Sequence, residues 1–217
     1  MKGLSQLYNI LFREYGPRYW WPASTPYEMM VGAILTQNTA WANVEKALAN
    51  FEGRLSPQFI ASVSGKELAR IIRPSGYYNQ KALSLKALTG WFEKYSYEIE
   101  KAREGEGQAL RLELLAVKGI GRETADSILI YALNKPFFIV DAYTRRLLFR
   151  FGCAVDDIIG SYEDLRLRIE NNIPRELKLY NEFHALIVEH AKRCCRKLPL
   201  CAGCPLAAVC CQRILEA

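Results

Sequence analysis

The chain has 217 residues, half of them hydrophobic, which is enough to bury a substantial core as one large domain or two small ones. The formal net charge of +6 and the pI near 8.9 permit a polyanionic partner, nucleic acid first and an anionic membrane surface second. No apolar run approaches the roughly 20 residues that span a bilayer, and the first residues lack the apolar stretch of a signal peptide, so we expect a cytoplasmic protein.

The hydrophobic pattern predicts helices throughout, with no period-two alternation and no turn signal typical of β-hairpins. An apolar stripe predicts a first helix near residues 4–11. Patterns of helix N-termini then occur at Thr25-Pro26, Ser56-Pro57 and Ser64-Gly65. A helix is expected from about residue 80 to residue 95.

The polar, glycine-containing residues 101–108 are expected to form a solvated linker. Residues 110–133 predict two helices separated by Lys118-Gly119-Ile120-Gly121, and a further helix is expected from about Asp141 to Gly152. The predicted fold class is therefore all-α, an array of roughly ten helices with short connections.

Six of the seven cysteines lie between residues 194 and 211, which favours a metal site over disulfides in a reducing compartment. Four thiolates within a short stretch can surround one soft metal centre, and the spacing C-x6-C-x2-C-x5-C differs from the paired C-x2-C of a zinc ribbon. Zinc remains an alternative, and Cys195 or Cys211 could replace a neighbouring ligand. The four cysteines of the spaced pattern are Cys194, Cys201, Cys204 and Cys210.

Two glycines, Gly119 and Gly121, lie between the two helices of residues 110–133. Glycine permits a tight turn and leaves the backbone uncovered, so the N–H groups that open the second helix can bind a phosphate. The alternative is an ordinary helical hairpin that ends its first helix with a glycine.

These features together resemble the endonuclease III superfamily of helix-hairpin-helix DNA glycosylases (HhH-GPD). The similarity covers nearly the whole chain: Leu35-Thr36-Gln37, the Gly76–Asn79 loop, the hairpin, Val140-Asp141 and the cysteines follow in family order. It implies a helix-hairpin-helix motif at about 110–133 within a six-helix barrel of residues 21–135. Residues 1–20 and 136–217 would form an iron–sulfur cluster domain, with the active site in a cleft between the two. It also implies a [4Fe–4S] cluster on the four cysteines and a monomer that binds double-stranded DNA containing a damaged base.

The resemblance makes Asp141 the catalytic carboxylate. Breaking an N-glycosidic bond builds positive charge on the sugar, which a carboxylate stabilises while it orients or deprotonates water. The alternative, that Asp141 caps the following helix, is compatible with this role. Relatives that also cut the DNA backbone carry a lysine just after the hairpin, where this chain has Glu123, so we expect a monofunctional enzyme.

Three of the four tryptophans, Trp20, Trp21 and Trp41, frame the first apolar helix after residue 25, and Tyr143 follows Asp141 by two. Aromatic faces can hold a flipped base, although core packing would explain tryptophans equally well. Within the superfamily, the tryptophan pair and residues 32–39 resemble the 3-methyladenine DNA glycosylase III branch, which stacks aromatic residues on alkylated purines. This chain departs from that branch at position 142, where an alanine stands in place of a lysine.

The resemblance also assigns residues that contact DNA. Gln37 would fill the space left by the extruded nucleotide, and Tyr77 would intercalate beside it. The remaining predicted DNA contacts lie in the hairpin and beside the cysteines, and they are Lys118, Gly119, Gly121, Arg193, Arg196 and Lys197. The predicted function is base-excision repair by a DNA glycosylase. The alternatives are a bifunctional glycosylase/AP lyase that uses another lysine, and a non-catalytic binder of damaged DNA.

Overall fold

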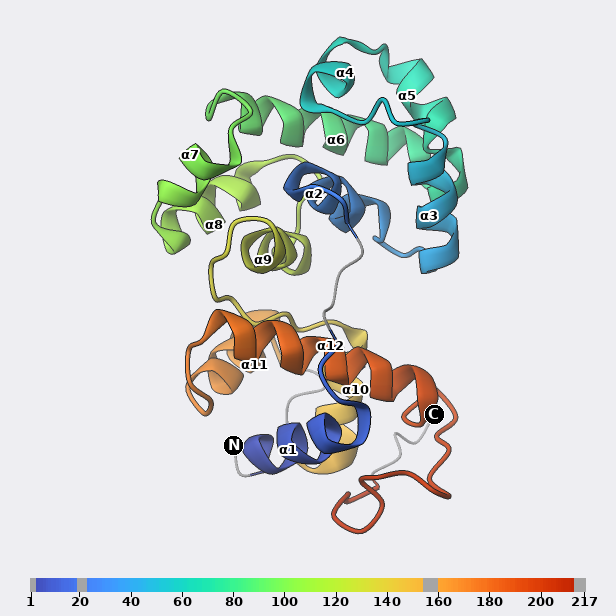
Figure 1. The fold of residues 1–217 in the computed structure, drawn as a ribbon, viewed down its shortest axis with the longest axis vertical. Helices are drawn as coiled ribbons and strands as arrows, with labels where there is room; N and C mark the ends of the chain where they lie inside the picture. The colour runs from blue at the N-terminus through green and yellow to red at the C-terminus, as the bar shows by residue number, and fades with distance from the viewer. Residues whose placement is uncertain (1–2, 19–22, 154–159, 213–217) are drawn as a thin grey trace. The chain divides into compact units, whose positions relative to one another are not determined.

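The computed structural model describes residues 3–18, 23–153 and 160–212. All regular elements in these ranges are helical, twelve α-helices and one short 3₁₀ helix (Figure 1), which confirms the predicted all-α class. The chain divides into two compact units, one of residues 21–135 and one that joins residues 1–20 to residues 136–217.

The unit of residues 21–135 is built from one uninterrupted stretch of chain. The resemblance implied six helices here, whereas its described part forms eight α-helices, several of them two turns or shorter. They are α2 (Pro26–Leu35), α3 (Trp41–Ala49), α4 (Pro57–Ser62), α5 (Gly65–Ile71), the 3₁₀ helix η1 (Arg73–Ser75), α6 (Tyr78–Glu93), α7 (Ile99–Glu104), α8 (Gly107–Ala116) and α9 (Arg122–Tyr131).

Helix α2 is the central helix of this unit, and it packs against α3, α6 and α9 (Figure 1). Eight of its ten residues are buried, as expected for a helix that is apolar on every side. The capping signals explain where the helices begin. The side chain of Thr25 accepts a hydrogen bond from the Glu28 N–H, and Ser56 and Ser64 cap α4 and α5 in the same way.

The prediction of a solvated linker over residues 101–108 is wrong. Helix α7 covers residues 101–104 of this segment, and α8 begins at Gly107. Distant contacts stabilise α7: the Arg103 guanidinium donates to the Ala132 carbonyl at 2.9 and 3.1 Å, and Lys135 Nζ donates to the Arg103 carbonyl at 2.7 Å. The polar composition hid a helix whose one buried residue is the small Ala102.

Helices α8 and α9 are joined by a buried ion pair as well as by apolar packing. The Arg111 guanidinium binds both carboxylate oxygens of Asp126, at 2.6 and 3.1 Å, and the side chain of Asp126 has no exposed surface. A bidentate pair of this kind fixes the orientation of one helix against the other. The turn at Gly119 and Gly121 therefore lies between two helices that are held in a defined geometry.

The second unit contains four described α-helices: α1 (Leu4–Tyr15), α10 (Ala142–Phe151), α11 (Tyr162–Glu170) and α12 (Leu177–Arg193). Helix α12 packs against both α1 and α10. The core is aromatic, with the Phe138 ring meeting Tyr180 and Phe183 edge to face at centroid distances of 5.4 and 5.7 Å. Of the described helices in either unit, none combines the length and the apolar character needed to cross a bilayer.

Candidate functional site

Asp141 lies where a buried extended segment meets helix α10. Residues 137–140 are at most 2% exposed, so the core fixes the chain on the N-terminal side of the carboxylate. On the other side Asp141 is the N-cap of α10, and its Oδ1 accepts a hydrogen bond from the Thr144 N–H at 2.7 Å. The predicted capping role is thus confirmed, and the carboxylate has little conformational freedom.

His184 of α12 is the second partner of Asp141. Its Nε2 lies 3.4 Å from Asp141 Oδ2, and the Asp141 side chain is 14% exposed. Burial alone would raise the pKa of Asp141. The hydrogen bond and charge of His184, with the hydrogen bonds of Thr144, outweigh burial and place the pKa below its ordinary value of 3.8. Asp141 is therefore an ionised carboxylate at neutral pH.

Gln37 contacts the hairpin, although 82 residues separate them along the chain. Its Nε2 donates to the Gly119 carbonyl at 3.1 Å and to Thr124 Oγ1 at 2.9 Å. The structure therefore brings together two of the predicted DNA-binding elements, the turn after α2 and the turn before α9.

The hairpin turn has the conformation that its glycines suggested. Gly119 has φ +87°, and a Cβ atom there would lie 1.9 Å from Ser84 Oγ, so only glycine fits. Gly121 has an ordinary φ of −90° and open space around it. Lys118, both glycines and Glu123 are exposed, which leaves the first turn of α9 accessible to a phosphate.

Tyr77 is 73% exposed, as an intercalating residue must be. It is the N-cap of α6 and has left-handed backbone angles, φ 44° and ψ 30°. Left-handed backbone is unusual for a tyrosine, so surrounding contacts must hold the loop in this shape.

The predicted base pocket is only partly described. Trp20 and Trp21 lie outside the described residues. Trp41 is the half-buried first residue of α3. Tyr143 is half-buried in the first turn of α10, and the Arg146 guanidinium lies 5.2 Å from the centre of its ring. Such a contact steadies the Tyr143 ring.

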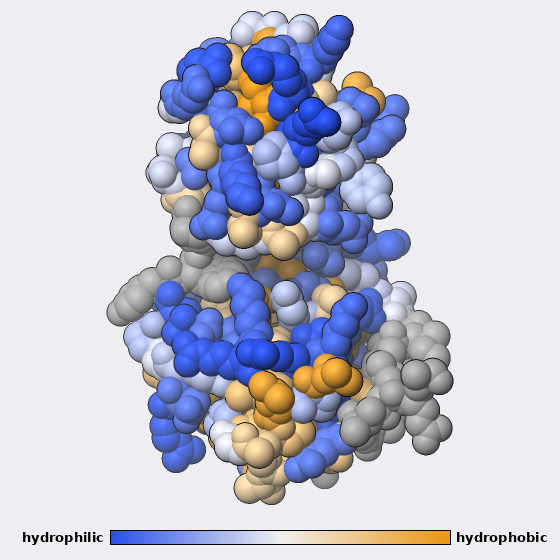
Figure 2. Space-filling model, turned by 90° about the vertical axis from the view of Figure 1, so that its right-hand side faces the viewer, coloured by the Kyte–Doolittle hydropathy of each residue, from blue (hydrophilic) through white to orange (hydrophobic). Residues whose placement is uncertain are grey.

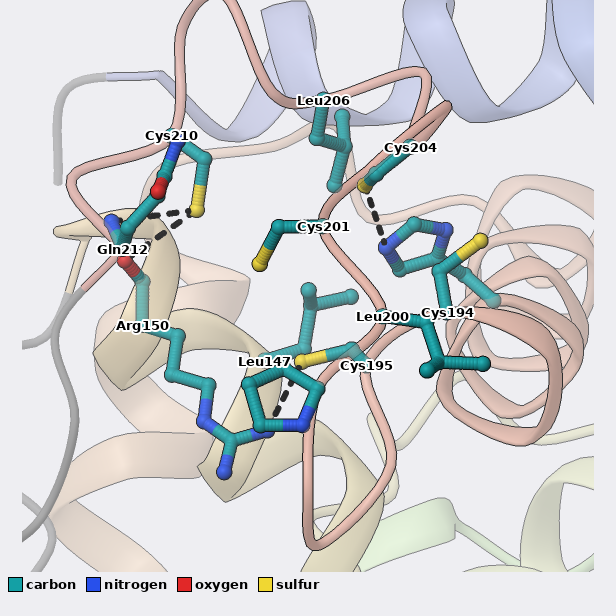
Figure 3. A pocket seen from close by; sticks show the side chains of 12 residues that line it. Leu147, Arg150, Cys194, Cys195, Leu200, Cys201, Cys204, Leu206, Cys210 and Gln212 are labelled. Atoms are coloured by element: carbon teal, nitrogen blue, oxygen red, sulfur yellow. Dashed lines mark hydrogen bonds between the residues drawn. The ribbon is translucent and has the colours of Figure 1, made fainter.

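The C-terminal cysteines surround a single pocket in the second unit (Figure 3). Figure 3 shows Cys195, Cys201 and Cys210 with their sulfurs turned into this hollow. The pocket is lined by Leu147, Arg150, His190, Cys194, Cys195, Pro199, Leu200, Cys201, Cys204, Leu206, Cys210 and Gln212. Five cysteines therefore line it, the four predicted ligands and Cys195, whereas Cys211 is not part of its lining.

The donor set fits a thiolate-ligated metal centre. The ligand atoms of His190, Cys194 and Cys204 lie within 4.8 Å of one another. Burial, strengthened by neighbouring thiols, raises the pKa of Cys204 and of Cys210, so a metal must displace protons to bind. Burial lowers the pKa of His190 to about 4, so its ring is neutral. If the Tyr15 hydroxyl, 2.9 Å from Nδ1, donates to it, Nε2 carries the hydrogen toward Cys204 Sγ at 3.8 Å.

Helix α10 anchors the cysteine loop. Arg146 Nε donates to the Cys195 carbonyl at 2.8 Å, and Arg150 donates to the carbonyls of Arg196 and Lys197. The same helix therefore begins with Asp141 and, two turns later, holds the loop that carries the predicted basic residues.

Of the predicted basic residues, Arg196 and Lys197 are exposed. Arg193 is exposed too, but it pairs with Glu189 at 2.5 Å and lies over the Tyr15 ring, so part of its charge is neutralised. Leu198 and Leu200, 85% and 51% exposed, follow them in the loop. In Figure 2 the hydrophobic patches on the visible face are small and separated by hydrophilic side chains.

Sequence reasoning missed three polar residues of the interior. They are His184 beside Asp141, His190 beside the cysteines, and Lys81 of α6, whose ammonium is buried. A periodicity signal existed for Lys81. It shares a helix face with Ser84, Leu85 and Leu88, all of them buried.

Within the described residues, α8 and α9 joined by the glycine turn form a helix-hairpin-helix motif. The family is also shown directly. The profile of the HhH-GPD superfamily of base excision DNA repair proteins matches residues 31–175, and the chain belongs to this superfamily.

Known relatives agree with this assignment. A Methanocaldococcus jannaschii protein, which bears the provisional name DNA repair glycosylase MJ1434, is 46% identical over 209 residues, 94% of each chain. The 3-methyladenine DNA glycosylase MagIII of H. pylori, solved with bound 1,N6-ethenoadenine, is 33% identical with a TM-score of 0.69, covering 88% of this chain and 95% of that one. An endonuclease III–DNA complex shares the fold, with a TM-score of 0.80, 24% identity, and coverage of 97% and 96%. The protein is thus a member of a base-excision DNA glycosylase family, as predicted.

Proposed function

We propose that this glycosylase hydrolyses the N-glycosidic bond of a damaged nucleotide with Asp141 as its catalytic carboxylate. The observation that carries the proposal is the held, ionised state of Asp141, fixed by Thr144 and His184. As the bond between C1′ and the base breaks, the base leaves with the electron pair. The carboxylate then stabilises the positive sugar and orients the water that attacks it.

The absence of a lysine at position 123 supports a monofunctional enzyme. Glu123 stands in the first turn of α9, where lyase relatives place the amine that forms an imine with the sugar. Lys118, in the turn before α9, is exposed and suits a phosphate contact instead. The alternative is a bifunctional enzyme that uses a lysine elsewhere.

An alkylated purine is the substrate class that we propose. Two observations favour it: the tryptophans that frame α2 in the sequence, and the 33% identity to a 3-methyladenine glycosylase solved with an ethenoadenine. A purine alkylated at N3 is cationic and leaves readily, so its pocket needs aromatic recognition more than acid catalysis.

We further propose that the cysteine pocket holds a [4Fe–4S] cluster on Cys194, Cys201, Cys204 and Cys210. The density of thiols around one pocket supports this, and the C-x6-C-x2-C-x5-C spacing selects these four. When bound, the cluster would cross-link the loop of residues 194–212, which contains no helix of its own, and so present its basic residues to DNA.

The test of the catalytic role is the Asp141→Asn variant on duplexes with alkylated, oxidised, deaminated or abasic sites, with base release and strand cleavage scored separately. Asparagine keeps the cap, so we expect base release to fall by roughly 10²–10⁴-fold while binding to an abasic duplex is retained. Base release at the wild-type rate would remove Asp141 from the proposal. If the wild type binds these duplexes but releases no base from any lesion, a non-catalytic binder is favoured.

The monofunctional assignment has its own test, borohydride trapping on the same duplexes. We expect base release from alkylated DNA without strand cleavage and without a covalent protein–DNA adduct. A trapped adduct would establish an imine-forming lysine and restore the bifunctional alternative.

A further inference from the structure

Lys81 carries a buried ammonium whose three hydrogen-bond partners are all neutral oxygens. Its Nζ donates to the Leu35 carbonyl at 2.8 Å, to Thr39 Oγ1 at 2.7 Å and to the Ser75 carbonyl at 2.7 Å. The residue is 3% exposed, and these three bonds use all three of its N–H groups. No carboxylate is among these partners, so the ammonium serves the backbone oxygens rather than an ion pair.

The three acceptors come from two separate turns. Leu35 and Thr39 bracket the turn that carries Gln37, and Ser75 precedes the loop that carries Tyr77. Thr39 Oγ1 also lies 2.5 Å from the Ser75 carbonyl and 3.0 Å from the Gln37 carbonyl, and its one proton can serve either. Lys81 therefore connects the two turns directly and through Thr39.

Both turns contain left-handed backbone at, or next to, the predicted DNA contact. Asn38, next to Gln37, has φ 52°, and Tyr77 has φ 44°. Left-handed conformations of residues other than glycine persist only where surrounding contacts hold them. The bonds from Lys81 fall within one to three residues of each of these positions, so they are placed to hold both turns.

We propose that Lys81 is a positioning residue for DNA binding, which locks the Gln37 turn to the Tyr77 loop so that both side chains enter the duplex together. The inference rests on the proposed function, because it takes Gln37 and Tyr77 as the residues that contact DNA. Gln37 extends the same network to the hairpin through its bonds to Gly119 and Thr124, so one buried amine stabilises a surface assembled from three segments.

Lys86, which is half-buried, offers a control on the same helix. Its Nζ also donates to two backbone carbonyls, those of Ala61 and Val63, but these lie at the end of α4 and carry none of the predicted DNA contacts. Lys81→Met and Lys86→Met each remove an ammonium from carbonyl acceptors, and only the first touches the two turns.

The experiment measures binding to a duplex with an abasic site, by fluorescence anisotropy, and the fluorescence of a 2-aminopurine placed opposite that site. We expect Lys81→Met to weaken binding about tenfold or more, because its charged hydrogen bonds are lost. It should also abolish the rise in 2-aminopurine fluorescence that we expect when the wild type binds. Lys86→Met should stay within about twofold of the wild type. Equal losses in the two variants would overturn the inference.

A double-mutant cycle with Tyr77→Ala separates positioning from general stability. If Lys81 acts through the placement of Tyr77 and Gln37, Lys81→Met should weaken binding by a clearly smaller factor in the Tyr77→Ala background than in the wild type, with the remainder due to Gln37. Full additivity would contradict the proposal. If Lys81→Met does not fold, Thr39→Val removes one shared acceptor at nearly constant volume and should show the same pattern at smaller size.

The role of Lys81 and the catalytic role of Asp141 can fail independently in these measurements. Binding to an abasic duplex needs no base release, so an inactive wild type that still prefers the abasic site leaves the role of Lys81 measurable. A wild type with no preference for the abasic duplex over an intact one would overturn the DNA-binding roles of Gln37 and Tyr77, and the inference with them.

Discussion

The ionisation of Asp141 depends on its contacts with His184 and Thr144. Burial raises the pKa of this carboxyl, and the contacts with His184 and Thr144 reverse the effect. In the folded protein the carboxylate therefore binds its proton less readily than in the unfolded chain. Its contribution to stability is complete above pH 3.8 and is lost as the pH falls through the lower pKa of the folded state.

We predict that His184→Phe moves the acid limb of base release to higher pH. The substitution removes the hydrogen bond and the charge, so burial is opposed only by Thr144 and the pKa of Asp141 rises. Single-turnover rates of base release between about pH 4 and pH 8 measure the limb, since a general base or charged stabiliser must be ionised to act. An unchanged limb in a folded variant would show that His184 does not set the ionisation of Asp141.

At the level of single residues, the sequence predicted the features that depend on near neighbours in the chain. The caps at Thr25, Ser56 and Ser64 involve partners three positions away, and all three are confirmed. Lys81 and His184 escaped because their partners lie in other elements, up to 46 residues away in the chain; periodicity places Lys81 on a buried face but does not reveal what it bonds to. Buried polar groups need hydrogen-bond partners, and those partners are set by tertiary contacts that periodicity does not reveal.

Among the elements, the α8–α9 hairpin depends on one glycine much more than on the other. A Cβ at position 119 would meet both the Oγ and the Cβ of Ser84, at 1.9 and 2.8 Å, in a backbone that already has positive φ. The Ser84 side chain lies on α6, so the hairpin packs closely on that helix at this point. Position 121 lacks both constraints.

We predict that Gly119→Ala destabilises the protein by about 1–3 kcal/mol, through the left-handed backbone and the overlap with Ser84. Gly121→Ala is the control, and it should cost less, because position 121 loses only the preference of a helix N-cap for glycine over alanine. Urea denaturation compares the two. The double variant Gly119→Ala with Ser84→Gly should recover part of the loss, and a cost that is equal at both glycines would contradict the steric explanation.

Helix α7 is the element that the sequence did not predict. The helix and its N-cap residue carry two ion pairs with i,i+3 spacing, Glu98 with Lys101 and Glu100 with Arg103. Exposed pairs of this kind contribute little to stability. The hydrogen bonds from Arg103 and Lys135 fix the segment, and they depend on where residues 132–135 lie in the folded unit.

At the scale of the whole molecule, the cysteine pocket belongs entirely to the unit formed by the two ends of the chain. We predict that Cys201→Ser lowers the iron content and the visible absorption of the purified protein, and reduces amide protection in residues 194–212 and α12. The described helices of residues 21–135 should keep their protection, because that unit has its own core.

Cys211→Ser is the matched control, since Cys211 is exposed and does not line the pocket, and it should retain full iron content. Iron content in Cys194→Ser and Cys195→Ser decides which of the two adjacent thiols is the ligand. An unchanged iron content in Cys201→Ser, or a wild type that contains zinc in place of iron, would overturn the cluster assignment.

The pairing of α1 with α12 has a consequence for how the chain is made. Leu4, Leu7 and Leu11 are buried on a helix that packs against residues synthesised some 170 positions later. During translation the continuous stretch 21–135 can fold as soon as it leaves the ribosome, whereas α1 must wait with its leucines uncovered until α12 emerges. Leu4, Leu7 and Leu11 therefore gain the packing that buries them only in the last stage of synthesis.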